Sequence, residues 1–200
     1  EATSLQSISY SDTTWSLLFN CNSVFGSTPL RQALAEVART AASTPDSGLF
    51  APATGLIPDG LTVDGIDYRD AAGDPTPAPV DAVSLYREKR LAEGNYTIAL
   101  APISAESGSV YNVLTQFTAQ GGGLTGYANS LYATQLAASS TATGSARCSL
   151  LADCERQLLS DCAVVPLFSQ QKRLLIADGI QGLVFDPFGP VLDLTDTTQN

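Results

Sequence analysis

Residues 15–38, WSLLFNCNSVFGSTPLRQALAEVA, join a short apolar run to an amphipathic segment. Residues 15–19 have the length and composition of a strand in a covered sheet. Thr28 and Pro29 follow a turn-rich stretch and predict a helix start, because threonine can cap a helix and proline fixes the first φ angle. Apolar residues then recur at helical spacing and predict the buried face of this helix: Leu30, Ala33, Leu34, Val37 and Ala38.

Strands and helices alternate along the rest of the chain. The hydrophobic patterns predict strands at residues 7–10, 96–102, 162–169 and 174–177, and helices at 30–41, 78–95, 110–117, 131–138 and 147–159. Residues 43–80 are rich in proline and glycine and predict a long loop, either with little structure or serving in binding. This alternation indicates one α/β or α+β domain over residues 1–200.

Composition excludes several classes of function. Twenty acidic and ten basic residues give a formal charge of −10, which repels nucleic acid and anionic lipid. No apolar run approaches the ~20 residues of a membrane span, so we expect no membrane insertion by this segment. The chain contains no histidine, which rules out Ser-His-Asp and Cys-His catalytic systems built from it and any His-containing zinc site. The absence of histidine fits a binding protein better than an enzyme, and we expect no catalytic residue, no metal and no cofactor. The chain begins at Glu1 and shows no signal peptide, which is typical of a processed protein or of an excised fragment of a longer one.

The four cysteines do not follow the CxxC spacing of zinc or redox sites. Cys148 and Cys154 fall on one predicted helix, where six residues span about 9 Å, too far for a disulfide. Cys21 ends one predicted strand and Cys162 begins another, so we predict a Cys21–Cys162 disulfide. The alternative is that all four are free buried thiols in a reducing compartment.

One loop stands out as a candidate binding site. Glu106 lies in the loop directly after the predicted strand at 96–102. Its neighbours Ser104, Ala105 and Ser107 are small. Small neighbours let a ligand approach the backbone closely, and a carboxylate there can neutralise a bound ammonium. The alternative is an ordinary exposed glutamate.

Several short motifs occur in a fixed order along the chain. They are FN at 19–20 with LRQAL at 30–34, GLIP at 55–58, NYTIALAPISAESGSVYNVL at 95–114, GYANSLYA at 126–133, LLSDCAVVPLF at 158–168 and GIQG at 179–182. Together they resemble the peptide/nickel (oligopeptide/dipeptide) class of extracellular solute-binding proteins of ABC importers. The resemblance covers residues 15–194. It implies a periplasmic-binding-protein-like lobe with a mixed sheet flanked by helices.

The resemblance also implies a function. Full members of the class have two lobes around a cleft, and this chain resembles the C-terminal, ligand-capping lobe, with the N-terminal lobe missing. The implied protein is extracellular, anchored at the cell surface as a lipoprotein or periplasmic, and it delivers a peptide or another small solute to an ABC permease. Glu106 stands where the class places an aspartate that pairs with the ligand's α-ammonium, and Ser104, Ala105 and Ser107 would offer backbone contacts. The class's aromatic residues are replaced around Pro102–Ile103 and at Ser107, so this is a divergent member.

Two other classes of function fit the sequence. A carboxylate-based extracellular glycan hydrolase would need two acids facing each other in a pocket, one with a raised pKa. A structural or adhesion module would use the Pro/Gly-rich loop at 43–80 to contact another protein. A binder, by contrast, requires Glu106 to face a cleft.

Overall fold

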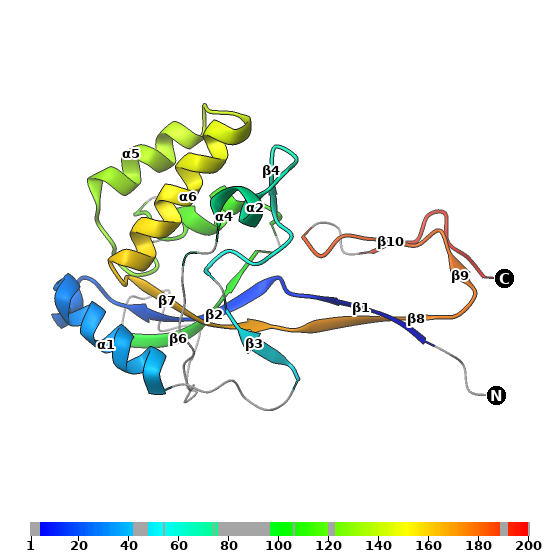
Figure 1. Ribbon diagram of the computed structural model, residues 1–200, viewed down its shortest axis with the longest axis horizontal. Helices are drawn as coiled ribbons and strands as arrows, with labels where there is room; N and C mark the ends of the chain where they lie inside the picture. Colours follow the sequence, from blue (N-terminus) through cyan, green and yellow to red (C-terminus); the bar gives the residue numbers. More distant parts are fainter. Residues whose placement is uncertain are drawn as a thin grey trace.

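The computed structural model describes residues 5–41, 48–53, 55–73, 75, 97–105, 107–119, 123–188 and 192–199. These residues form a globular part, built on a four-stranded sheet, and a long two-stranded arm that projects from it (Figure 1). The helices among them are the 3-10 turn η1 (Val24–Gly26), α1 (Thr28–Ala41), α2 (Tyr68–Ala72), α4 (Val110–Thr115), α5 (Ser130–Ser139) and α6 (Gly144–Ser160).

The sheet of the globular part has the order β3-β7-β2-β6. Its strands are β2 (Thr13–Phe19), β3 (Phe50–Pro52), β6 (Ile98–Ser104) and β7 (Val164–Gln170). The central strand β2 pairs with β6 from Thr13↔Ser104 to Phe19↔Ile98, and a bulge between Trp15 and Ser16 interrupts its register with β7. The layering of helices on a sheet confirms the predicted α/β or α+β class. The prediction of a mixed sheet is wrong for the described strands, because each of their pairings is antiparallel.

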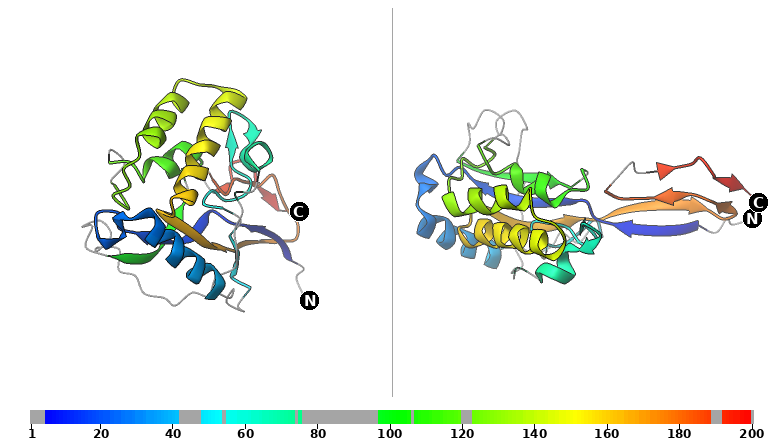
Figure 2. Two further views of the ribbon diagram at one scale, coloured as in Figure 1. Left: turned by 60° about the vertical axis from the view of Figure 1, so that its left-hand side comes forward. Right: turned by 90° about the horizontal axis from the view of Figure 1, so that it is seen from above.

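Two hydrophobic cores lie on opposite faces of this sheet. Successive residues of a strand point to opposite faces, so Leu18 belongs to one core and Phe19 to the other. Helices α4, α5 and α6 cover the first face, and α1 packs on the second (Figure 2). Strands β2 and β7, which lead to the arm, therefore lie between α1 on one side and α5 and α6 on the other.

The arm continues two strands of the central sheet. Strand β1 (Leu5–Tyr10) runs into β2 across residues 11–12, and β7 runs into β8 (Lys172–Ala177) across Gln171. β1 and β8 pair in an antiparallel register from Leu5↔Ala177 to Tyr10↔Lys172. Both chain ends lie at the far end of the arm, and the C-terminal segment returns beside it (Figure 2). That segment carries β9 (Ile180–Gln181), β10 (Val184–Phe185), β11 (Leu192–Asp193) and β12 (Thr198–Gln199).

The buried face of α1 differs from the prediction. Leu30 and Val37, both expected inside, are 38% and 63% exposed, whereas Arg31 is only 3% exposed and Ala35 is fully buried. The helix is rotated relative to the prediction, with Arg31 on its inner face. The guanidinium of Arg31 is satisfied there because it donates hydrogen bonds to backbone carbonyls. The other predicted helices and strands in the described part are confirmed within a few residues. The helix predicted at 78–95 lies outside the described residues.

The Pro/Gly-rich segment is more ordered than the sequence suggests. The prediction of a long loop over residues 43–80 is wrong for residues 50–73, which contain β3, the hairpin of β4 (Thr62–Val63) and β5 (Ile66–Asp67), and α2. Apolar residues scattered between its prolines and glycines belong to the main core: Leu56, Ile57, Leu61, Val63 and Tyr68. Their irregular spacing matches neither the strand period nor the helix period, which hid them in the sequence.

The predicted Cys21–Cys162 disulfide is absent, and none of the four cysteines is disulfide-bonded. Cys21 packs against the core on the α6 side of the sheet, whereas Cys162 belongs to the core on the α1 side. The thiol of Cys21 lies 3.5 Å from the carbonyl of Phe19, and that of Cys162 lies 3.4 Å from the carbonyl of Leu159. Closeness in the strand order does not bring these two side chains together because the sheet separates them.

The thiols are expected to react only when the chain unfolds. Burial raises the pKa of Cys154 to about 12, and it also raises the pKa values of Cys21 and Cys148. Since the thiolate is the reactive form, the native protein at pH 8 should react slowly with a disulfide reagent such as DTNB. In denaturant without reductant, four thiols per chain should titrate. A count of two would show that a disulfide forms.

Candidate ligand-binding site

The predicted ligand loop begins at the end of β6, where the globular part meets the arm. Ser104 is the half-buried last residue of β6 and lies opposite Thr13 of β2. Ala105 is buried; its N–H donates to the carbonyl of Asp12 at 2.7 Å, and its carbonyl accepts from Gly108 N–H at 2.8 Å. Ser107 is exposed, and Glu106 lies outside the described residues. Their role in binding a ligand stays a prediction.

The residues after this loop are in close contact with the C-terminal segment. Gly108 has a φ of +63°, and a Cβ atom placed on it would lie 2.4 Å from the carbonyl oxygen of Phe188. A Cβ on Gly60, whose φ is +85°, would lie 3.5 Å from the ring of the same phenylalanine. Phe188 itself packs against the main core. Two glycines therefore let one aromatic residue hold the C-terminal segment beside the predicted ligand loop.

A buried ionic cluster joins the arm to this loop. Asp12 is only 4% exposed. Its carboxylate accepts one hydrogen bond from Lys172 Nζ and one from the hydroxyl of Thr13, each at 2.7 Å. Its backbone carbonyl holds Ala105. Asp12 thus connects the junction of β1 and β2, the first residue of β8 and the end of β6.

A cavity of about 450 Å³ opens at the same junction, which we call the waist cavity. It is lined by Ser9, Tyr10, Ser11, Asp59, Gly60, Gln171, Asp186, Pro187 and Phe188. These residues come from the end of β1, the loop before β4, the link between β7 and β8, and the C-terminal segment. Phe188 is shared by the waist cavity and the contact with Gly108, so the cavity adjoins the predicted ligand loop.

A buried ion pair fixes the loop that leads into the waist cavity. Glu155 on α6, 1% exposed, accepts from the N–H groups of Leu56 and Ile57 at 2.9 and 3.1 Å. Its carboxylate also accepts from the Tyr68 hydroxyl at 2.9 Å and from Arg69 at 2.7 and 3.0 Å. Burial and the adjacent Glu155 carboxylate raise the pKa of Tyr68, which keeps its hydroxyl a donor. This carboxylate is thus satisfied by its partners and supports the segment just before Asp59.

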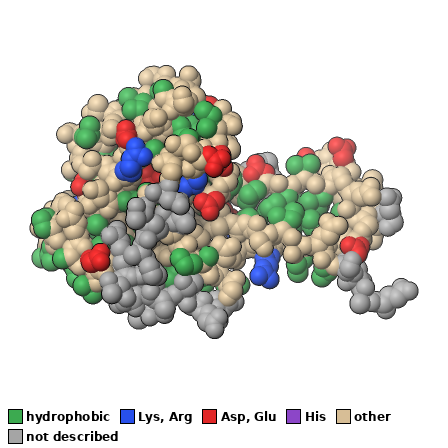
Figure 3. All heavy atoms as spheres, viewed as in Figure 1, with side chains coloured by type: hydrophobic (Ala, Val, Ile, Leu, Met, Phe, Trp, Pro, Cys, Tyr) green, Lys and Arg blue, Asp and Glu red, His purple; other side chains and the backbone are tan. Residues whose placement is uncertain are grey.

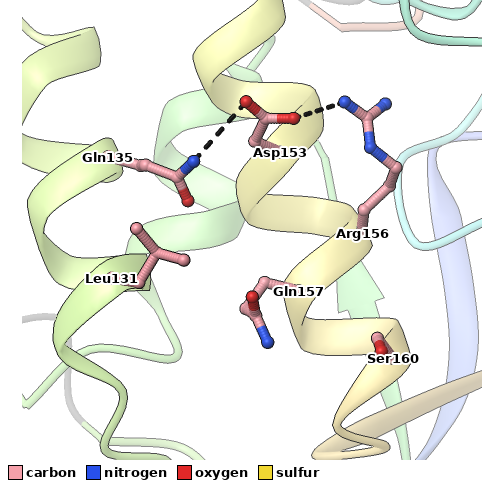
Figure 4. A pocket seen from close by; sticks show the side chains of 6 residues that line it. All are labelled: Leu131, Gln135, Asp153, Arg156, Gln157 and Ser160. Atoms are coloured by element: carbon pink, nitrogen blue, oxygen red, sulfur yellow. Dashed lines mark hydrogen bonds and ion pairs between the residues drawn. The ribbon is translucent and has the colours of Figure 1, made fainter.

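A second depression lies between α5 and α6. Its lining residues come from these two helices and not from the loop after β6. Its walls are Leu131, Gln135, Asp153, Arg156, Gln157 and Ser160, as Figure 4 shows. Asp153 forms an exposed ion pair with Arg156 and lies 3.5 Å from the Gln135 amide. Ser104, Ala105 and Ser107, the predicted ligand-binding residues that the structure describes, do not line it.

Sequence reasoning found the loop after β6 but missed the residues around it. Asp12 and Lys172 are 160 positions apart, so no local pattern could pair them. The turn at Asp186, which accepts from Phe188 N–H at 2.9 Å, has an Asp-Pro signal that could have marked it.

Among the described residues there is no group of three or more potential metal ligands. No described helix is long and apolar enough to cross a membrane.

Neither a protein-family model nor a curated protein sequence matches this chain. Solved structures do match its fold. Listeria monocytogenes OppA bound to peptide matches with a TM-score of 0.70 and 18% identity over 97% of this chain and 50% of that one. The substrate-binding domain of an oligopeptide ABC transporter from Bacillus anthracis matches at 0.66 and 15% over 97% and 51%. A dipeptide-binding protein from Pseudoalteromonas sp. SM9913 in complex with Met-Leu matches at 0.66 and 12% over 98% and 50%.

The chain thus spans about half the length of these three solved proteins while nearly all of it is matched. The resemblance inferred from the ordered motifs is confirmed at the level of the fold. This chain has the fold of about half of a peptide-type substrate-binding protein of ABC transporters.

Proposed function

We propose that this chain is the C-terminal, ligand-capping lobe of a solute-binding protein that delivers peptides or another small solute to an ABC importer. The ligand is bound, without chemistry, in a cleft between this lobe and an N-terminal lobe that precedes it in the full-length protein. Closure of the two lobes around the ligand would present the closed form to the permease.

The arm is the observation that carries this proposal. Strands β1 and β8 leave the globular part together and end beside both chain termini (Figure 1). Hydrophobic side chains gather on the visible face of the arm (Figure 3). Exposed apolar residues on the arm and on the C-terminal segment include Leu5, Leu175, Val184, Leu192 and Leu194. Apolar exposure of this extent is typical of a surface that another part of the protein covers, and a preceding lobe fits it.

The proposed location is outside the cell, either anchored at its surface as a lipoprotein or in the periplasm. A structural neighbour supports this location: a periplasmic murein tripeptide-binding protein matches the fold with a TM-score of 0.66. In the cleft, Glu106 would pair with a cationic group of the ligand. Ser104, Ala105 and Ser107 would supply backbone contacts next to it.

Thermal-shift screening of the full-length protein against peptide and small-solute libraries tests the proposal. A peptide ligand at 100 times its Kd should stabilise the protein by about 2.7 kcal/mol and raise its Tm saturably. Glu106→Ala should reduce the shift, while Ser107→Ala should leave most of it. A full shift in Glu106→Ala would reject the anchor and keep the binder. No shift with any peptide or solute would reject the proposed function.

A further inference from the structure

We infer that Asp12 is a positioning residue, which couples the angle of the arm to the shape of the predicted ligand loop. This inference rests on the proposed function and concerns the regulation of the same site. Asp12 acts through two other residues rather than on the ligand. Its backbone carbonyl holds the N–H of Ala105 in the loop, and its carboxylate binds Lys172 on the arm.

The strands that form the arm bend where Asp12 lies. The pairing of β1 with β8 ends at Tyr10 and Lys172, and the pairing of β2 with β7 begins at Thr14 and Ser169. Between these pairs lie three residues on the first strand and only two on the second. Unequal lengths of this kind bend a pair of strands. A change in the angle of the arm is therefore taken up by a few residues at strand ends, which is where proteins place hinges.

A buried ionic contact spans this bend. The side chain of Asp12 is 5% exposed and that of Lys172 is 30% exposed, and Lys172 Nζ donates to one carboxylate oxygen at 2.7 Å. The hydroxyl of Thr13 donates to the other oxygen at 2.7 Å. A carboxylate buried this deeply is costly unless a counter-charge and hydrogen bonds compensate it. Because the counter-charge comes from the first residue of β8, the contact favours one angle of the arm.

The arm and the segment beside it hold the predicted ligand loop from two sides. On one side Ala105 N–H donates to the carbonyl of Asp12 at 2.7 Å, and the carbonyl of Ala105 accepts from Gly108 N–H at 2.8 Å. On the other side a Cβ atom on Gly108 would lie 2.4 Å from the carbonyl oxygen of Phe188. The C-terminal segment that carries Phe188 also contacts the arm, because Tyr10 packs edge-on against another phenylalanine of that segment with ring centroids 4.9 Å apart. Movement of the arm therefore changes contacts on both sides of the loop.

This coupling gives the ligand loop a connection to the proposed N-terminal lobe. The arm carries both chain ends at its far end, so in the proposed protein the arm leads toward that lobe (Figure 2). A change in the angle between the lobes then reaches Ala105 through Asp12. Because coupling between two sites is reciprocal, a solute held at the loop shifts the lobes toward the arrangement in which it binds more tightly.

Two measurements on the full-length protein without ligand test the coupling. Hydrogen-exchange mass spectrometry follows the Ala105 amide, which reports its bond to Asp12. Spin labels at Ser7→Cys on the arm and Thr134→Cys on α5, both exposed positions, report the arm angle, and a sample without these substitutions gives the background from native thiols. Lys172→Met keeps the aliphatic stem but leaves the buried carboxylate without its ammonium. In this variant we expect the Ala105 amide to exchange about tenfold faster and the distribution of label distances to broaden.

Three further variants separate the ionic contact from the packing of the lysine stem. Asp12→Asn keeps the shape of the side chain and leaves only a partly exposed ammonium unpaired, so both readouts should change less than in Lys172→Met. The double variant Asp12→Asn with Lys172→Met leaves no unpaired charge and should return both readouts to the level of Asp12→Asn. Arg173→Met is the matched control, because Arg173 is the next basic residue of β8 and is exposed. Both of its readouts should keep their wild-type values.

The coupling requires that the two readouts change together. If only the exchange of Ala105 or only the label distances change in Lys172→Met, the arm and the loop are independent and the inference is overturned. It is also overturned if the amide of Phe19, which donates to the carbonyl of Ala163, gains the same factor in exchange, since the variant then destabilises the whole fold. A double variant that stays at the level of Lys172→Met rejects the ionic contact as the cause. If Lys172→Met does not fold, a joint change of both readouts in Asp12→Asn decides the question.

Failure of this coupling is distinguishable from failure of the proposed function. Neither measurement uses a ligand, so independent readouts would leave solute binding standing. A thermal-shift screen without any response would reject the proposed function and leave the contact between the arm and the loop in place.

Discussion

Replacing Glu155 with alanine is expected to lower the free energy of unfolding of this chain by about 3–5 kcal/mol, the range for breaking a buried ion pair from one side. The substitution removes the acceptor for Leu56 N–H, Ile57 N–H and the Tyr68 hydroxyl, and it leaves the guanidinium of Arg69 without its counter-charge. The side chains of Arg69 and Glu155 are only 9% and 2% exposed, so water cannot replace the lost partner. Arg69 keeps its contact with the carbonyl of Ile57, which is too little to balance a buried charge.

Urea-induced unfolding followed by the fluorescence of Trp15, the single tryptophan, measures this change. The matched control lies on the same helix: Asp153 also pairs with an arginine, but both side chains are about half exposed. Asp153→Ala should therefore cost less than about 1 kcal/mol. If Glu155→Ala is as mild as Asp153→Ala, the cluster does not hold the segment from Leu56 to Tyr68 in place.

Local periodicity was enough to predict the longer elements of the described part, those of six or more residues. Residues 164–168 form a continuous apolar run and residues 15–19 an apolar run interrupted only by Ser16, because their strands are covered on both faces, by α1 on one side and by the α4–α6 helices on the other. The arm could not be predicted. Strand β8 alternates exposed and half-buried residues, which shows a strand but not that it pairs with β1 about 170 residues earlier. Register across such separations is set by the tertiary fold rather than by local pattern.

The candidate site was predictable only in part. The loop at Ser104–Ser107 is visible because small and acidic residues follow an apolar strand. Its surroundings depend on Asp12, Asp59 and Phe188, which come from three distant segments and carry no shared motif. The failed disulfide has the same origin, since strand order alone does not tell on which face of a sheet a cysteine lies.

Arg31→Met is expected to cost at least about 3 kcal/mol of unfolding free energy, because it keeps the aliphatic stem but removes every hydrogen bond of the guanidinium. Arg31 donates to the carbonyls of Asp161 at 2.9 Å and Phe25 at 2.6 Å, and to the hydroxyl of Thr28 at 2.8 Å. Bonds from a charged group are worth about 1.5–3 kcal/mol each, and buried carbonyls left without a donor add to the loss. This arginine of the LRQAL motif therefore ties α1 to the end of α6.

Its neighbour Gln32 provides the control for that variant. The amide of Gln32 donates to the carbonyl of Ser160 at 2.9 Å, so it also joins α1 to the end of α6, but from the exposed face of the helix. Gln32→Ala should cost less than about 1 kcal/mol, because water replaces its single bond. Urea unfolding of both variants separates burial from mere bridging between the same two helices. Equal losses would mean that the inner position of Arg31 contributes nothing beyond the bridge, and the rotation of α1 toward that side chain would then need another cause.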